Sequence, residues 1–425
     1  MKKHLSLILL LMMFVACSGN NDINHNQGNT DSNQSNIVPD KAMHKSTKRG
    51  VAFNFARLDD AMLLSPAISW FYNWGPDFTV TDLDTWFGME SVDFLPMAWN
   101  GGFDENRIRT YVMAHPRCKY ILAYNEPNLN DQARMTPAAA AEKWPRLKAL
   151  ADELQLKIVS PAMNYGTLEG YHDPIQWLDE FFALVPLSDV DVIAVHCYMA
   201  SPSGLISYIK RFSKYGKPVW MTEFCAWDPV PGSVETQLSY MCSVLNWMEQ
   251  SDLLERYAWF IPRTSSAVDK EPYMQLLTHT SPSELTEAGK IYTSFSSFDK
   301  SVWLDASKPV SAKDYVALSN NSIQIRSCAD TAAMMIKGIQ EGQWVEYQLF
   351  IPQEATNIQL CYSSPVSLSI AYYIDGELIT FAEAQREETT DWRILSTSMP
   401  LPAGRHTLRL MIGRGSLNLK WIQTQ

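Results

Sequence analysis

The sequence lacks several features that mark common functional classes. It contains no GxGxxG motif and no P-loop, so a dinucleotide- or phosphate-binding loop is not expected. Its seven cysteines form no CxxC pair and show no cysteine–histidine spacing, which argues against a zinc site. It also lacks an excess of positive charge: the net charge is −11, whereas nucleic-acid binding requires a basic surface. We therefore expect no nucleic-acid partner.

The composition is that of a folded protein rich in aromatic side chains. Of the 425 residues, 46% are hydrophobic and 19% are charged, so wholesale disorder is excluded. A domain has roughly 100–200 residues, which makes two domains the starting expectation. The chain has 14 tryptophans. Flat rings can stack on sugars, although core packing explains any single tryptophan equally well.

The first 47 residues do not have the pattern of a folded domain. Lys2 and Lys3 precede an apolar run at 5–16, which is too short to span a bilayer as a mature helix. The run ends at Cys17 and resembles a bacterial lipobox. This resemblance implies a lipoprotein signal peptide at 1–16 and a lipidated Cys17, followed by a flexible polar tether that extends to residue 47. An ordinary signal peptide with a chance cysteine is the alternative.

We therefore expect an exported bacterial lipoprotein that its lipid anchor holds at the outer membrane, on either side of it. No other segment is long enough for a transmembrane helix. We expect a monomer. Export permits disulfides, and Cys328 with Cys361 is the pair we considered. Free, buried cysteines are the default expectation.

Residues 48–299 alternate strand-like and helix-like patterns. Helical patterns at 135–156, 174–185 and 233–250 lie between some of the apolar runs. Eight such runs predict a (β/α)8 TIM barrel, with a doubly wound sheet as the competitor. The runs are VAFNF (51–55), SWFYNW (69–74), VDFLPMAW (92–99), YILAYNE (120–126), KIVSPAM (157–163), DVIAVHCY (191–198), PVWMTEF (218–224) and YAWFI (257–261).

Residues 300–425 show a different pattern, in which apolar and polar residues alternate along short segments between turn signals. Such alternation predicts a smaller antiparallel β-sandwich, or jelly roll. The segments are 343–351, 358–364, 368–376, 392–401, 404–413 and 417–423.

Two predicted barrel strands end in a glutamate. Glu126 ends the fourth apolar run and Glu223 lies at the end of the seventh. Active sites of barrels lie at the carboxyl ends of the strands, where a buried carboxylate is costly unless it is hydrogen-bonded or used. Glycoside hydrolysis needs two carboxyl groups beside the scissile bond. A structural ion pair explains either glutamate alone, but the two together favour a glycosidase.

Six motifs resemble glycoside hydrolase family 128, the Asl1-like β-1,3-glucanases of clan A. They are SWFYNWG (69–75), FLPMAWN (94–100), ILAYNEPN (121–128), VSPAMN (159–164), AVHCYM (194–199) and VWMTEFCAW (219–227). The resemblance implies retaining hydrolysis of β-1,3-glucan of the laminarin or curdlan type. It implies that Glu126 is the acid/base, that Glu223 is the nucleophile and that Asn125 binds the sugar 2-hydroxyl.

Further residues are expected to bind substrate. His196 and Tyr198 share one face of the sixth strand, so we expect Tyr198 to hold Glu223 and His196 to line the −1 subsite, with a core histidine as the alternative. Other candidates lie at or just beyond strand ends: Asn73, Trp74, Trp99, Trp227 and Trp259. We expect four other tryptophans to pack in the core: Trp144, Trp177, Trp220 and Trp247.

The C-terminal segments GQWVEYQLFIP (342–352) and GRHTLRLMIGRGSLNLKWIQ (404–423) resemble family 6 carbohydrate-binding modules. This resemblance suggests Trp392 and Asn418 as glycan contacts, and a stabilising sandwich is the alternative. The family commonly has two acidic residues in its opening strand that help hold a structural calcium ion. Here Ser311 and Lys313 occupy those positions, which argues against calcium. The barrel shows no cluster of metal ligands, and we expect no cofactor.

The sequence thus predicts a β-1,3-glucanase. The alternatives are a hydrolase of another β-glycan, a non-catalytic surface lipoprotein that binds glycan, and a structural surface protein. The choice between endo and exo action stays open, because it depends on loops at the barrel mouth.

Overall fold

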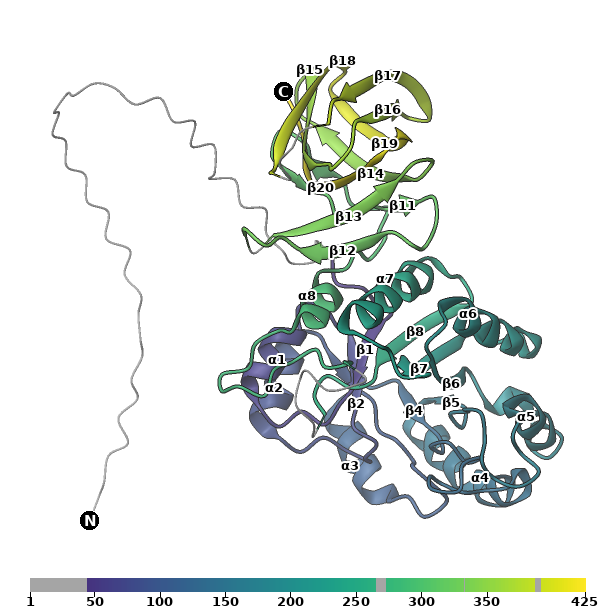
Figure 1. Ribbon diagram of the computed structural model, residues 1–425. Helices are drawn as coiled ribbons and strands as arrows, with labels where there is room; N and C mark the ends of the chain where they lie inside the picture. The colour runs from purple at the N-terminus through teal and green to yellow at the C-terminus, as the bar shows by residue number, and fades with distance from the viewer. Residues whose placement is uncertain (1–43, 265–272, 332, 387–390) are drawn as a thin grey trace, which may run out of the picture. The chain divides into compact units, whose positions relative to one another are not determined.

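The computed structural model describes residues 44–264, 273–331, 333–386 and 391–425 (Figure 1). The stretch Val38–Gln425 groups into one compact unit. Cys17 and the predicted signal peptide lie outside the described residues. The end of the predicted tether is packed, because Ser46 is buried and its hydroxyl donates to Glu249 Oε2 at 2.7 Å. In the described part of the chain, no helix is long and apolar enough to cross a membrane.

The first part of the described chain alternates short strands with helices (Figure 1). The strands are β1 (Arg49–Ala52), β2 (Trp70–Tyr72), β3 (Asp93–Phe94), β4 (Tyr120–Leu122), β5 (Lys157–Val159), β6 (Ile193–Met199), β7 (Val219–Asp228) and β8 (Leu254–Trp259). The α-helices are α1 (Leu58–Leu64), α2 (Thr81–Met89), α3 (Glu105–Ala114), α4 (Pro137–Leu154), α5 (Pro174–Phe182), α6 (Pro202–Arg211), α7 (Val234–Gln250) and α8 (Glu287–Ser294). Two 3₁₀ turns are η1 (Leu187–Asp189) and η2 (Phe212–Tyr215).

The parallel strands close into a TIM-barrel-like ring. One ladder runs β3-β2-β1-β8-β7-β6 and a second pairs β4 with β5. Single bridges join the two ladders, Met97 to Leu122 and Val159 to Val192. Pairing of β1 with β8 closes the ring, so the doubly wound alternative, whose sheet stays open, is wrong.

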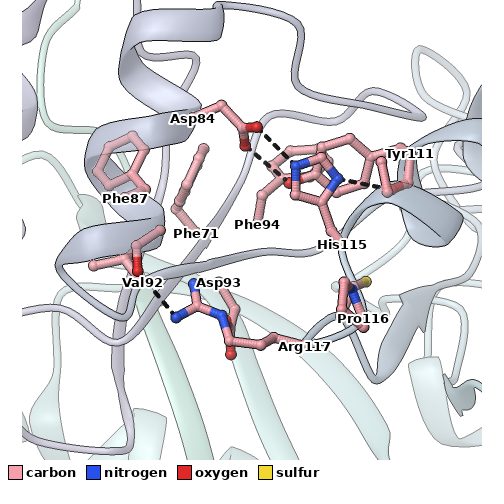
Figure 2. Close-up of a pocket in the computed structure, with 13 residues that line it drawn as sticks. Phe71, Asp84, Phe87, Val92, Asp93, Phe94, Tyr111, His115, Pro116 and Arg117 are labelled. Carbon is pink, nitrogen blue, oxygen red and sulfur yellow. Dashed lines mark hydrogen bonds and ion pairs between the residues drawn. The ribbon is translucent and has the colours of Figure 1, made fainter.

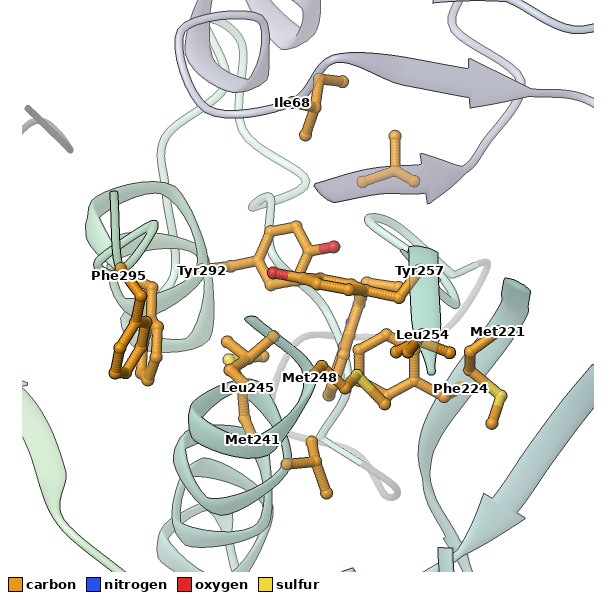
Figure 3. Close-up of a cluster of buried hydrophobic side chains, with 14 of the residues drawn as sticks. Ile68, Met221, Phe224, Met241, Leu245, Met248, Leu254, Tyr257, Tyr292 and Phe295 are labelled. Carbon is orange, nitrogen blue, oxygen red and sulfur yellow. The ribbon is translucent and has the colours of Figure 1, made fainter. Parts of the chain in front are cut away.

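Two apolar clusters pack against the barrel strands, one inside the ring and one outside it. The cluster inside includes Trp70 and Trp220, both fully buried, so Trp220 is a core residue as predicted. The cluster outside joins the strands to the helices, and Figure 3 shows Met241, Leu245 and Met248 of α7 in it. Burying one such side chain stabilises the fold by about 1.5–3 kcal/mol. Trp144 and Trp177 are also buried, and Trp247 is half-buried against the same cluster.

Helix α4 shows how local sequence fixes an element boundary. Thr136 precedes it with extended backbone, and its Oγ1 accepts a hydrogen bond from the amide of Ala139 at 3.2 Å. Pro137 occupies the first turn, where its missing N–H costs nothing. Thr136 is therefore the N-cap of α4.

The C-terminal part is rich in sheet. One sheet has the order β12 (Gln324–Ser327), β13 (Met334–Gln340), β20 (Ser416–Thr424), β15 (Ala355–Ser363) and β18 (Arg393–Leu401), with β10 (Val310–Ser311) paired to β20. The other has the order β11 (Ala317–Leu318), β14 (Trp344–Ile351), β19 (Gly404–Arg414), β16 (Leu368–Ile374) and β17 (Glu377–Ala384), with β9 (Leu304–Asp305) paired to β14. The pairing is antiparallel except between β9 and β14. The sequence pattern missed the strands before β14.

Buried hydrogen bonds join α7 to the C-terminal part. The amide of Asn246, which is fully buried, donates to the carbonyl of Ile323 at 2.8 Å and accepts from the hydroxyl of Tyr315 at 2.8 Å. The hydroxyl of Ser296 donates to the carbonyl of Tyr315 at 2.7 Å. Buried hydrogen bonds therefore connect the barrel part of the chain to the C-terminal part.

All six cysteines in the described residues are buried, and none of them is in a disulfide. The pairing of Cys328 with Cys361 that we considered is therefore not formed.

Candidate active site

A cleft of about 500 Å³ opens where the carboxyl ends of the barrel strands meet. Both predicted catalytic glutamates line it. The lining residues are Trp74, Trp99, Asn125, Glu126, Leu129, Gln132, Asn164, Tyr198, Glu223, Trp227, Asp228 and Phe260.

The two glutamates come from opposite sides of the ring. Glu126 follows β4 in a left-handed conformation with φ of 43°, and its amide donates to the carbonyl of Ala162 at 3.0 Å. Glu223 lies within β7. The exposed fractions of Glu126 and Glu223 are 6% and 4%. One oxygen of each, with a nitrogen of His196, lie within 4.8 Å of one another. The barrel therefore brings two buried carboxyl groups together.

Glu223 is held mainly by neutral donors. Its Oε1 accepts hydrogen bonds from the hydroxyl of Tyr72 at 2.8 Å and from the indole Nε1 of Trp74 at 2.7 Å. The hydroxyl of Tyr198 donates to Oε2. Burial, together with the negative charge of Glu223, raises the pKa of both tyrosines well above its usual value, so both keep their protons. Three side-chain donors therefore hold both oxygens of Glu223 in place.

Glu126 has a different environment. Its Oε1 accepts a hydrogen bond from Nδ2 of Asn164 at 2.9 Å, and Nδ1 of His196 lies 2.9 Å from the same oxygen. Burial alone would raise the pKa of Glu126. The positive charge of His196 and the hydrogen bonds from His196 and Asn164 outweigh burial and hold the pKa below its usual value.

His196 bridges the two carboxylates. Its Nδ1 also lies 3.3 Å from Oε2 of Glu223. Burial alone would lower the pKa of His196, but the charges of Glu223 and Glu126 outweigh it and raise the pKa above its usual value. The two carboxylates therefore favour the protonated form of His196, whose ring lies beside the oxygen of Glu126.

Several predicted substrate-binding residues reach the cleft. Trp74, Trp99 and Trp227 line it, and Trp227 is 42% exposed. Asn125 donates from Nδ2 to Gln132 Oε1 at 3.1 Å, while its Oδ1 is buried and has no hydrogen-bond partner among the described residues. A buried acceptor close to the carboxylate pair therefore has no hydrogen-bond partner among the described residues.

Three predictions need correction. Trp259 is fully buried, and its indole donates to the carbonyl of Met274 at 2.7 Å, so it does not reach the cleft; the next residue, Phe260, lines it. The amide of Asn73 is used within its own loop, where Oδ1 accepts from the Gly75 amide at 2.9 Å. His196 is fully buried between the carboxylates and does not line the cleft.

Sequence reasoning missed four site residues: Tyr72, Gln132, Asn164 and Phe260. Tyr72 and Asn164 lie in motifs that had been recognised, but no role was assigned to them. Their position at the ends of the second and fifth strands was the available signal, because polar groups at that edge of a barrel converge.

Glu126, His196 and Glu223 are the only group of metal-ligand side chains, among the residues that the structure describes, whose atoms could share an ion. Tyr72, Trp74, Tyr198 and Asn164 already satisfy both carboxylates by hydrogen bonds. The donor set therefore fits an acid–base pair without an ion.

A second cavity of about 320 Å³ lies between α2 and α3 (Figure 2). Aromatic rings form its inner wall, and His115 pairs with Asp84 at 2.7 Å near Tyr111. Arg117 pairs with Asp93 at 3.4 Å. Its charged groups are paired with one another, and no residue of the catalytic cleft lines it.

The two residues predicted to bind glycan in the C-terminal part are both half-buried. Nζ of Lys420 lies 5.2 Å from the ring centroid of Trp392 and so covers one face of the ring. Asn418 accepts from the amide of Gly338 at 2.8 Å and donates to Ser363 Oγ at 3.1 Å, so its side chain links strands β13 and β15.

Comparison with known families gives the class of this protein. Residues 50–292 match the family described as glycosyl hydrolase catalytic core, and residues 311–425 match carbohydrate binding module (family 6). The match to the catalytic core covers more than half of the chain, so the protein is a glycoside hydrolase, and its C-terminal part is similar to family 6 carbohydrate-binding modules.

Solved structures narrow the family. An endo-β-1,3-glucanase of glycoside hydrolase family 128 (subgroup II) from Pseudomonas viridiflava is 40% identical, with 59% of this chain and 98% of that chain covered and a TM-score of 0.54. One from Sorangium cellulosum is 32% identical, with 58% and 97% covered and a TM-score of 0.51. The chain belongs to glycoside hydrolase family 128.

A fungal relative also matches part of the chain. Alkali-sensitive linkage protein 1 of Schizosaccharomyces pombe is 26% identical over an alignment of 241 residues that covers 54% of this chain. The chain spans only 41% of the length of that relative.

Proposed function

We propose that the protein hydrolyses β-1,3-glucan with retention of configuration, with Glu223 as nucleophile and Glu126 as general acid and base. The observation that supports this proposal is the short distance between the two carboxyl groups. One oxygen of Glu126 and one oxygen of Glu223 lie within 4.8 Å of each other. Retaining enzymes hold the groups about 5–5.5 Å apart, whereas inverting enzymes need about 6.5–9.5 Å to admit a water.

The reaction has two displacements. In the first, an oxygen of Glu223 forms a bond to the anomeric carbon, the glycosidic C–O bond breaks, and Glu126 gives its proton to the departing oxygen. In the second, Glu126 takes a proton from a water, whose oxygen bonds to the anomeric carbon as the bond to Glu223 breaks. Tyr72, Trp74 and Tyr198 donate hydrogen bonds to Glu223 and so orient its carboxylate for the first attack.

The acid step requires a proton on Glu126. We assign the supply of that proton to His196, because the two carboxylates favour its protonated form and its Nδ1 lies 2.9 Å from Oε1 of Glu126. A bound sugar excludes water from the cleft, which disfavours the separated charges of the pair. Transfer of the proton from His196 to Glu126 then leaves both groups neutral, and the protonated Glu126 can act as the general acid.

Aromatic side chains and one amide would bind the sugars. Trp74, Trp99, Trp227 and Phe260 offer ring faces along the cleft. The free Oδ1 of Asn125 can accept a hydrogen bond from the 2-hydroxyl. Because the relatives that are 40% and 32% identical are described as endo-β-1,3-glucanases, we assign internal cleavage of the chain. The reaction as written needs no metal and no cofactor.

The test is digestion of linear β-1,3-glucan by the wild-type protein and Glu223→Gln, with products separated by size. Glu142→Gln is the control, because Glu142 lies on α4 with its side chain 71% exposed. We expect short oligosaccharides of mixed length from the wild type and the control, and none from Glu223→Gln. Activity in Glu223→Gln would contradict the nucleophile. If the wild type cleaves only another β-glycan, the proposed substrate is wrong. If the wild type binds β-1,3-glucan without cleaving it, the proposed hydrolytic activity is wrong.

A further inference from the structure

The opening strand of the C-terminal part lacks the ligands that the family 6 resemblance implies for calcium. Ser311 belongs to β10, which pairs with β20 through Trp421, and Lys313 follows two residues later. Calcium binds six to eight oxygen ligands, with carboxylates prominent among them. A hydroxyl and an ammonium replace the two acids, and the ammonium repels a cation. These residues do not fit the ion.

Lys313 is not a surface lysine. Its side chain is fully buried, and Nζ donates to Oδ1 of Asp314 at 2.7 Å, where Asp314 is itself 8% exposed. A buried charge is costly unless it is paired. Burial raises the pKa of Asp314, and the opposing charge of Lys313 favours its ionised form. The pair therefore places an ammonium group beside a carboxylate inside the domain.

The segment that carries Lys313 connects the two sheets. The amide of Ala312 donates to the carbonyl of Lys420 on β20 at 3.0 Å. The hydroxyl of Tyr347 on β14 donates to the carbonyl of Ala312 at 2.7 Å. A cation held here therefore sits at a point where both sheets are tied together, as a structural metal ion would.

We propose that the ammonium of Lys313 takes the place of the calcium ion, so that the C-terminal domain of this protein folds without calcium. Among the described residues, no cluster of three acidic or histidine side chains in this domain could replace the missing ligands. The proposal rests on the family 6 resemblance and on this buried pair, and it is independent of the hydrolytic mechanism.

The first test compares thermal unfolding of the full protein in EDTA and in millimolar calcium, together with its metal content by mass spectrometry. We expect the same unfolding midpoint in both and no stoichiometric calcium. A midpoint that rises with calcium, or one bound calcium ion per chain, would overturn the proposal.

The second test restores an acid with Lys313→Glu. We expect a midpoint several degrees lower in EDTA, because two buried carboxyl groups then lie side by side, and substantial recovery when calcium is added. Lys308→Glu is the matched control, since its side chain is 78% exposed, and calcium should leave its midpoint unchanged. If calcium does not stabilise Lys313→Glu, Lys313 does not occupy the place of the cation. If that variant fails to fold, the wild-type unfolding midpoints and metal content still show whether the domain folds without calcium.

Discussion

Replacing His196 with glutamine removes the imidazole between the carboxylates of Glu126 and Glu223 while keeping a hydrogen-bond donor. His196 is fully buried and lies 2.9 Å from Glu126 and 3.3 Å from Glu223. Removing one partner of a buried ionic group costs about 3–5 kcal/mol, because the remaining charges stay unpaired. We expect the folded protein to survive with a lower unfolding temperature.

The kinetic consequence depends on the substrate. Without His196, Glu126 has lost the group that supplies its proton, and general acid catalysis contributes about 10²–10⁴-fold. Glucan, whose leaving group needs that proton, should lose up to this factor in kcat. An aryl β-glucoside with an acidic phenol needs little acid assistance and should lose far less. The assay is kcat and KM on both substrates for the wild type and His196→Gln.

The pH dependence has a defined sign. The pKa of His196 is raised in the folded protein, so its stabilising contribution is fully present below the ordinary histidine value of about 6.5 and is lost as the pH rises through the raised pKa. The difference in unfolding free energy between wild type and His196→Gln should therefore shrink at alkaline pH. The basic limb of the rate profile should move to lower pH in the variant, because the shared proton leaves more easily.

Two results would refute this reasoning. Equal losses on glucan and on the activated glucoside would show that His196 does not act through the acid. An unchanged basic limb in His196→Gln would show that the stored proton is not on this histidine.

Three further outcomes are expected. Glu126→Gln should lose more activity on glucan than on the activated aryl glucoside, measured as kcat, and equal losses would contradict its role as acid. Deleting residues 300–425 should lower the unfolding temperature of the barrel in a thermal melt, because Asn246 of α7 would lose buried partners at about 0.5–1.5 kcal/mol for each hydrogen bond; an unchanged melt would show that these bonds contribute nothing. Cys17→Ala should abolish labelling by a radioactive fatty acid in a bacterial host, and a labelled variant would exclude Cys17 as the lipidated residue.

The strand pattern of the barrel was readable because it depends on local apolar runs. The run at 191–198 predicted β6, which spans Ile193–Met199. The run at 218–224 predicted β7, which continues to Asp228. The position of Glu126 and Glu223 at the ends of barrel strands could be predicted for a related reason, because a carboxylate at the end of an apolar run is easily recognised in a sequence. Chemistry at strand ends is therefore visible in a single sequence.

The predictions that failed depend on the register between neighbouring strands, which a single sequence does not show. A register shift between Val195 and His196 breaks the regular pairing of β6 with β7, so the alternation of faces did not tell how deeply His196 is buried. The same reasoning placed Trp259 in the cleft instead of Phe260. Strands β9 to β12 have only two to four residues, too few for a period of two to show. Strands β13 and β17 have seven and eight residues and were missed although they are long enough.

The central claim, double displacement by Glu126 and Glu223, is tested most directly by the stereochemistry of the first product. Proton NMR during early hydrolysis of a β-1,3-linked oligosaccharide distinguishes the two anomers before they interconvert. The account predicts that the β-anomer appears first and the α-anomer only later by mutarotation. Appearance of the α-anomer first would contradict it, because a single displacement by water would then be the mechanism.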